Sequence, residues 1–156
     1  MVHRNAKLSC IAVLLCLGVQ ALIAAEDFPP RAIAPKNDVC FACHMKVEDS
    51  GYAVELIDED NKVLIFDSLV ESVVWAHKVK KEKGKEPWRG HWVQDATTRT
   101  WVRVHDAFFV YTKEVPTPMN DGVHAFATSA EAESFLANKK DGKLVLRKEL
   151  ESFSNK

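Results

Sequence analysis

Residues 52–66 read Tyr52-Ala53-Val54-Glu55-Leu56-Ile57, Asp58-Glu59-Asp60-Asn61 and Lys62-Val63-Leu64-Ile65-Phe66. The first and last of these runs are short, apolar and rich in β-branched residues, which predicts strands. The acidic and amide residues between them are typical of a turn. The stretch therefore predicts two strands joined by a turn, and the rest of the chain is interpreted around this pair.

After the second strand the pattern changes to that of a helix. Asp67 or Ser68 is placed to cap a helix that begins near Leu69, with apolar residues at helical spacing on one face. The charged run from 78 to 86 ends at a glycine and a proline, as expected for a solvated helix end and loop. Two further strands are predicted, over 91–95 and 100–104.

The second half of the chain repeats this arrangement. Strands are predicted over 107–111 and 124–127, and Thr128 or Ser129 caps a helix from Ala130 to Asn138. A last strand runs from Lys143 to Arg147. Each half therefore reads strand, strand, helix, strand, over about 51–95 and 107–147. Because units of this size bury little surface alone, we expect an α+β fold in which the two tandem units pack as one small domain.

The segment on the amino-terminal side of the first strand carries the chemistry. It reads Asp38-Val39-Cys40-Phe41-Ala42-Cys43-His44-Met45-Lys46-Val47. Thiolate, imidazole and thioether groups bind soft or borderline metals, and here all three lie within six residues. Three interpretations follow: a soft-metal site, covalent attachment of a c-type haem through Cys40-x-x-Cys43-His44, or a disulfide.

The first 36 residues are interpreted as targeting and linker sequence. Residues 1–25 have a basic start, an apolar run and two small residues at the end, which predicts a signal peptide. Residues 26–36 contain spaced prolines and predict an extended linker. We therefore expect an exported protein, and an uncleaved amino terminus would be its one route to a membrane anchor. A net charge of -1 gives no electrostatic case for nucleic acid as a partner.

Several short motifs follow one another along the chain: Asp38-Val39-Cys40, Cys43, Met45, Val47, Phe66-Asp67, Trp92-Val93, Asp95, Trp101-Val102, Pro118-Met119, Ala125-Phe126, Ala130, Ala132 and Ala137. In this order they resemble the NosL family, the accessory proteins of nitrous oxide reductase. The resemblance covers about residues 37–150. His44 is a departure, since family members commonly have glycine at that position.

The resemblance implies a fold and a function. The implied fold is two linked strand-strand-helix-strand units, in agreement with the duplication described above. The implied function is that of a periplasmic metallochaperone that binds Cu(I) and supplies copper to nitrous oxide reductase or its maturation machinery. By position, the metal-binding cysteine and methionine of the family fall on Cys43 and Met45, and the loop proline and methionine fall on Pro118-Met119.

The residues themselves also support copper. Cu(I) is soft, and a cysteine with a methionine selects it better than carboxylates would. If the segment is extended, Cys43 and Met45 lie on the same face. Met119 is a candidate third ligand, Cys40 joins if the site is a dithiolate, and His124 is a candidate nitrogen ligand.

The alternatives remain open at the level of sequence. In a haem c protein Cys40 and Cys43 would form the thioethers and His44 the axial ligand, with Met119 or another histidine opposite. Against this, the chain enters a strand soon after the motif, whereas haem pockets are usually built from helices. A disulfide alone leaves His44 and Met45 unexplained. The sequence shows no nucleophile with an evident base and no phosphate loop, so we do not expect an enzyme.

Overall fold

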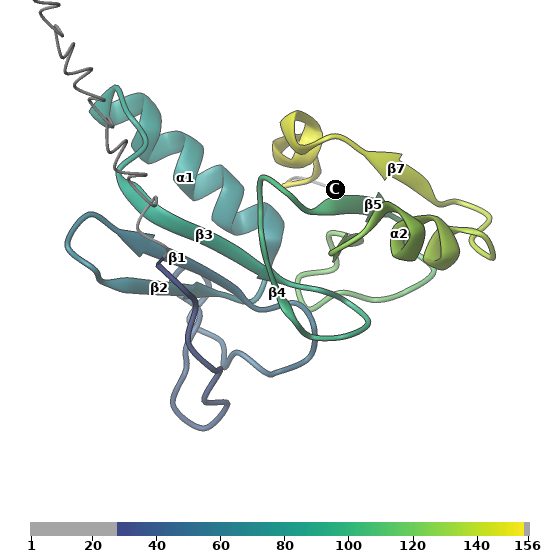
Figure 1. The fold of residues 1–156 in the computed structure, drawn as a ribbon, viewed down its shortest axis with the longest axis horizontal. Helices are drawn as coiled ribbons and strands as arrows, with labels where there is room; N and C mark the ends of the chain where they lie inside the picture. The colour runs from purple at the N-terminus through teal and green to yellow at the C-terminus, as the bar shows by residue number, and fades with distance from the viewer. Residues whose placement is uncertain (1–27, 155–156) are drawn as a thin grey trace, which may run out of the picture.

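The computed structural model describes residues 28–154 as two small antiparallel sheets, each with a helix, packed into one domain (Figure 1). The element order confirms the predicted α+β fold with its two strand-strand-helix-strand units. The expected signal peptide, residues 1–25, lies outside the described residues. Between residues 28 and 154, no helix is long and apolar enough to cross a membrane.

The first unit forms a four-stranded sheet in the order β2-β1-β3-β4. Apolar residues of the two predicted strands pair across it, for example Leu56 with Leu64. Helix α1 begins as predicted, because the Ser68 side chain accepts a hydrogen bond from the backbone of Glu71. It ends where Gly84 takes a left-handed conformation at φ 73°. The elements are β1 (Val54–Asp58), β2 (Val63–Phe66), α1 (Leu69–Lys83), β3 (Trp88–Gln94) and β4 (Trp101–Arg103).

The second unit forms a three-stranded sheet in the order β6-β5-β7. Thr128 caps α2 in a capping box with Glu131. The helix and the last strand are shorter than the sequence predicted, and a 3-10 helix, η1, follows β7 where the strand pattern was extended to Arg147. The elements are β5 (Phe108–Tyr111), β6 (Val123–Phe126), α2 (Ser129–Leu136), β7 (Lys143–Val145) and η1 (Arg147–Phe153).

The two units share one hydrophobic core. Figure 1 shows α1 lying across the four-stranded sheet, with η1 from the carboxyl end of the chain beside it. Phe66 and Val70 of the first unit belong to the same buried cluster as Phe109, Val123 and Leu150 of the second. A small separate cluster lies under α2. The shared cluster gives each unit the buried area that it could not supply alone.

Asp95 joins the two units through its buried carboxylate. One oxygen accepts hydrogen bonds from the backbone amides of Thr97 (2.8 Å) and Thr98 (2.7 Å) in the turn after β3. The other oxygen accepts one from Ala127 (2.8 Å), just after β6. Burial raises the pKa of Asp95, but these backbone donors outweigh burial and hold the pKa below its ordinary value. In the sequence Asp95 lies at the end of a predicted strand, and the prediction missed the link between the units.

A second link lies at the start of α1. The Ser68 hydroxyl donates a hydrogen bond to Asp121 at 2.7 Å while it also caps the helix. Asp121 in turn accepts hydrogen bonds from the Thr117 hydroxyl (3.0 Å) and the Val123 amide (2.9 Å). This network fixes the 117–122 loop of the second unit against the first turn of α1.

The segment expected as a linker contacts the sheet. The Arg31 guanidinium pairs with both carboxylate oxygens of Asp38, at 2.9 Å and 2.6 Å. The Arg31 amide donates to Glu55, a fully buried residue of β1, at 3.0 Å. Nearby, the Trp92 indole donates to the carbonyl of Phe28 at 2.7 Å. These contacts tie residues 28–38 to β1 and β3 and hold the cysteine motif in place.

The Asp95→Ala variant tests the link between the units. Three backbone amides lose a charged, buried acceptor, at about 1 kcal/mol for each hydrogen bond, so we expect the free energy of unfolding to fall by about 3 kcal/mol in a urea melt. Because the pKa of Asp95 is lowered in the folded state, its contribution is present above the unfolded pKa of about 4. The difference between wild type and variant should therefore shrink as the pH falls through the lowered pKa of Asp95.

The matched control is Asp106→Ala. The Asp106 side chain is 63% exposed and pairs only with His105, at 3.3 Å, among the interactions of the described residues. Its removal should change stability by less than about 0.5 kcal/mol. Equal losses in the two variants would contradict the role given to Asp95.

Candidate metal centre

Residues 38–47 form a tight turn that is closed by backbone hydrogen bonds. The Cys40 amide donates to the Met45 carbonyl (2.7 Å), the His44 amide to the Cys40 carbonyl (3.0 Å), and the Val47 amide to the Asp38 carbonyl (3.0 Å). His44 takes a left-handed conformation at φ 60°. The extended segment considered at the level of sequence is therefore wrong, and alternation along a strand does not place Cys43 and Met45 on one face.

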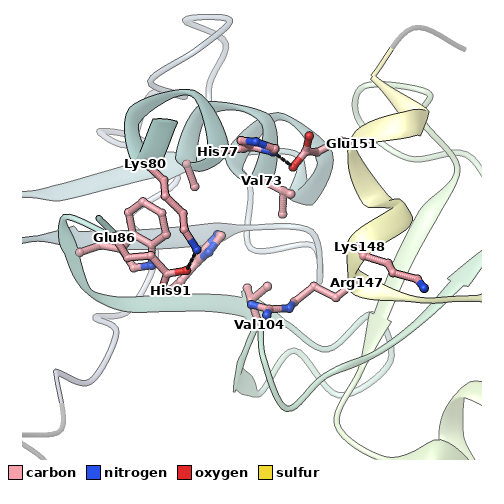
Figure 2. Close-up of a pocket in the computed structure, with 11 residues that line it drawn as sticks. Val73, His77, Lys80, Glu86, His91, Val104, Arg147, Lys148 and Glu151 are labelled. Carbon is pink, nitrogen blue, oxygen red and sulfur yellow. Dashed lines mark hydrogen bonds and ion pairs between the residues drawn. The ribbon is translucent and has the colours of Figure 1, made fainter. Parts of the chain in front are cut away.

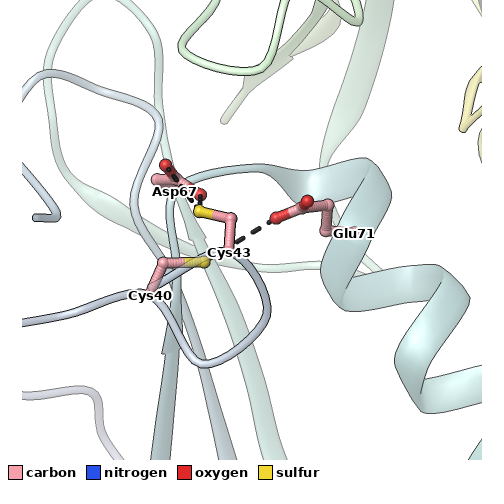
Figure 3. Close-up of side chains that lie close together, drawn as sticks. All are labelled: Cys40, Cys43, Asp67 and Glu71. Atoms are coloured by element: carbon pink, nitrogen blue, oxygen red, sulfur yellow. Dashed lines mark hydrogen bonds between the residues drawn. The ribbon is translucent and has the colours of Figure 1, made fainter. Parts of the chain in front are cut away.

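The turn brings two thiols next to two carboxylates (Figure 3). Each of Cys40, Cys43, Asp67 and Glu71 offers a ligand atom, and these four atoms all lie within 4.8 Å of one another. Cys40 and Asp67 are buried, whereas Cys43 and Glu71 are partly exposed. The cluster therefore has a closed inner side and an open outer side.

Each thiol donates a hydrogen bond to a carboxylate. The Cys43 sulfur lies 3.4 Å and 3.5 Å from the two oxygens of Asp67, and the Cys40 sulfur lies 3.7 Å from Glu71. Burial raises the pKa of Cys40 to about 12. Burial also raises the pKa of Glu71, and the nearby negative charge of Asp67 adds to this effect. The Cys40 thiol is therefore protonated at neutral pH, and a metal ion that binds its sulfur must displace that proton.

Local sequence explains why these four residues meet. Asp67 directly follows β2, and the Ser68 cap then turns the chain so that Glu71 lies in the first turn of α1. Phe41, inside the cysteine turn, packs edge-on against Phe66 and Trp75, with ring centroids 5.8 Å and 5.5 Å apart. The aromatic contacts hold the turn over the junction of β2 and α1.

Of the six residues singled out from the sequence, Cys40 and Cys43 belong to this cluster of thiols and carboxylates. Met45 is 46% exposed and lines a hollow of about 300 Å³ that Asp67 and Pro118 also line. Met119 lines a second hollow, of about 350 Å³, beside Glu71. The two methionines thus lie close to the carboxylates of the site, in separate hollows.

The two candidate histidines lie apart from the cluster. His44 is exposed on the outer side of the turn. His124 is fully buried, and its Nδ1 lies 3.2 Å from the Tyr52 hydroxyl while its ring packs against Phe135. Its pKa is lowered by burial, so the ring is neutral.

The same geometry bears on the haem and disulfide interpretations. Covalent haem would require both sulfur atoms to face an apolar cavity. Here Cys40 faces Glu71, Cys43 faces Asp67, and both thiols are free. Thiols surrounded by carboxylates favour a metal ion over a porphyrin.

Sequence reasoning missed Asp67 and Glu71 as site residues. Asp67 was noted as a candidate helix cap and as part of the Phe66-Asp67 motif, and an acidic residue such as Glu71 in the first turn of a helix is ordinary. Their spacing carries a signal, because residues four apart lie on one side of a helical turn. The spacing of Asp67 and Glu71 could therefore have indicated that the two carboxylates lie close together.

Comparison with known proteins agrees with the fold and the motifs. A family model described as NosL matches residues 31–153, which is most of the chain. The crystal structure of the copper chaperone NosL from Shewanella denitrificans is similar to this chain, with a TM-score of 0.60 and 21% sequence identity. The match covers 75% of this chain and 93% of that one. No curated protein sequence matches the chain.

The asymmetric burial of the two thiols can be tested by alkylation. At about pH 8, iodoacetamide should modify Cys43 at least about a hundredfold faster than Cys40, because burial keeps the Cys40 thiol protonated and inaccessible. Mass spectrometry of peptides from a time course measures both rates. In urea the two rates should become similar, and similar rates in the folded protein would contradict the described burial.

Proposed function

Because the chain belongs to the NosL family, we propose that it is an exported copper chaperone that binds Cu(I) at Cys40 and Cys43 and delivers it to nitrous oxide reductase. The observation that carries this proposal is the pair of free thiols held together by a preformed turn. The structure of a copper chaperone with the same fold adds support.

The donor set suits a soft cation. Thiolate sulfur selects Cu(I) over Mg²⁺ and Ca²⁺, and the thioethers of Met45 and Met119 lie close enough to the site to be considered as further soft donors. Cysteine and carboxylate ligands also bind Zn²⁺. A Zn²⁺ site would depend on the carboxylates for its affinity, whereas a Cu(I) site would depend mainly on the thiolates.

Copper binding must displace the thiol protons. A Cu(I) ion forms bonds to the two sulfur atoms, and each thiol loses its proton. The carboxylates of Asp67 and Glu71 already accept the hydrogen bonds of these thiols, so they are placed to receive the protons. If the two carboxylates keep the two protons, the two thiolates and one Cu(I) ion give the site a net charge of -1. If the protons leave the site, the two ionised carboxylates make the net charge -3. This matters because unpaired buried charge is costly.

The open side of the site indicates how copper could leave. Cys43 is partly exposed, while Cys40 is fully buried. Ligand exchange requires an incoming donor to reach the metal before the first bond breaks, so we propose that a donor of the acceptor protein attacks on the Cys43 side. The 38–47 turn that carries Cys43 also carries three exposed apolar side chains, which is typical of an interaction surface: Val39 (49% exposed), Phe41 (41%) and Met45 (46%).

The ligands can be tested by Cu(I) competition titration against a bathocuproine-type chelator. Cys40→Ser and Cys43→Ser should each weaken Cu(I) binding by about a hundredfold or more, equivalent to about 2.7 kcal/mol, because the described residues hold no third cysteine to replace the lost sulfur. Asp67→Asn and Glu71→Gln should each cost less than about tenfold. Met45→Leu measures the contribution of the exposed thioether in the same assay.

Two results would count against this assignment. Retained tight Cu(I) binding in the double cysteine variant would place the copper elsewhere. Carboxylate variants that lose as much affinity as the cysteine variants, together with tight Zn²⁺ binding by the wild type, would identify a site for a harder cation.

The proposed acceptor side is tested by transfer kinetics with copper-free nitrous oxide reductase. Val39→Lys should slow Cu(I) transfer by about tenfold while Cu(I) affinity stays unchanged, since the lysine opposes an apolar contact without touching the metal. The matched control is Leu144→Lys, because Leu144 is 54% exposed on β7 in the other sheet. Equal slowing by both variants, or by neither, would remove this face from the proposal.

A further inference from the structure

A cavity of about 270 Å³ opens on a part of the molecule that shares no residue with the metal centre (Figure 2). It lies between α1, the amino-terminal part of β3, and η1, the last helix of the described chain. Its walls comprise the apolar residues Val73, Ala76, Trp88 and Val104, together with His77, Lys80, Glu86, His91, Arg147, Lys148 and Glu151.

The floor of this cavity is the edge of the shared core. Ala76 and Val104 are buried, at 5% and 3% exposure, and Val73 and Trp88 are partly buried residues that pack on the core cluster. Such a surface gains free energy when it is covered by an apolar group. The floor therefore favours a ligand with an apolar body.

The acidic side chains at the rim of the cavity have partners, whereas two of the basic side chains have none among the described residues. Both acidic residues are paired, Glu86 with Lys80 at 2.7 Å and Glu151 with His77. The side chains of Arg147 and Lys148 have no hydrogen bond or ion pair with any residue in the described part of the chain. The rim thus has unpartnered positive charge and no unpartnered carboxylate.

Arg147 and Lys148 differ in where they point. Figure 2 shows Arg147 extending into the cavity, with its guanidinium near Val104, whereas Lys148 extends away from it. The positive charge of Arg147 also reaches His91. The pKa of His91 is lowered to about 4, first by burial and then by Arg147. His91 is therefore neutral, and its Nε2 is paired with the Ser72 hydroxyl at 3.0 Å. Arg147 supplies the positive charge inside the cavity.

We propose that this cavity binds a small organic monocarboxylate, whose carboxylate pairs with Arg147 while its apolar body lies against Val73, Trp88 and Val104. A guanidinium matches a carboxylate with two parallel hydrogen bonds, which an isolated ammonium does not. The volume suits a ligand of about ten non-hydrogen atoms and is too small for a folded peptide segment. A bare inorganic anion would leave the apolar floor uncovered.

The experiment uses 3-phenylpropionate as the probe, titrated into the purified protein and followed by amide and indole NMR shifts. We expect saturable binding with a Kd of about 1 mM or tighter, with shifts at Trp88 and at Val73. The neutral analogue 3-phenylpropan-1-ol keeps the apolar body of the probe without its negative charge. Inorganic phosphate keeps a negative charge without the apolar body. Both should bind at least about tenfold more weakly.

Matched variants assign the charge. Arg147→Gln should weaken binding by about tenfold or more, and Arg147→Lys should recover part of the loss. Lys148→Gln should change the Kd by less than about twofold, since that side chain points away. Both residues are exposed, so these variants keep the wild-type fold, which a thermal melt verifies.

Four outcomes would overturn the proposal. They are the absence of saturable binding, equal binding of the alcohol, equal binding of phosphate, and an unchanged Kd in Arg147→Gln. Equal binding of phosphate would reduce the cavity to a general anion site, and equal binding of the alcohol to a general apolar one. Copper plays no part in the assay, so its result is independent of the metal centre.

Discussion

The hydroxyl of Ser68 makes the hydrogen bonds on which the arrangement of this molecule depends. It accepts from the first turn of α1, which sets where the helix begins, and it donates to Asp121, which sets where the second unit lies. Asp67 precedes it and Glu71 follows it three residues later. The same residue therefore fixes the helix start, the docking of the 117–122 loop and the position of both carboxylates in the metal centre.

The position of the two thiols results from two packing contacts of the 38–47 turn. Core packing draws Cys40 inward, to complete burial, and aromatic contacts of Phe41 hold the turn above the helix. The short turn then leaves Cys43 near the surface, three residues later. One thiol is consequently fixed on the inner side of the cluster and the other is accessible. Under the proposed function, this division suits a site that binds a cation and also releases it.

Much of the fold followed from sequence because local signals agreed with the final structure. Short apolar runs rich in β-branched residues, on either side of the turn at 58–61, predicted β1 and β2, and the caps Ser68 and Thr128 predicted both helix starts. The end of the second unit was less well predicted. The apolar pattern through Leu146 continued the strand, whereas the chain turns there into η1 and packs Leu150 and Phe153 into the core.

The site was predictable only in part, for a physical reason. Cys40 and Cys43 carry their chemistry in their residue type, so a short spacing was enough to find them. Asp67 and Glu71 matter through their distance from the thiols, and that distance depends on how the 38–47 turn folds back over α1. The left-handed conformation of His44 decides this geometry, and nothing in its residue type requires that conformation.

The pairing of Arg31 with Asp38 has a consequence for the energetics of metal capture. Asp38 accepts from Arg31 and from the Ala34 amide through its side chain, while its carbonyl accepts from Val47 on the far side of the turn. These hydrogen bonds clamp the turn at both ends, and none of them uses a thiol of the cluster. The conformational entropy of the turn is therefore lost during folding, so under the proposed function metal binding need not order the loop again. A receptor built in this way would have nearly the same shape empty and filled, and competing donors, instead of unfolding, would remove its cargo.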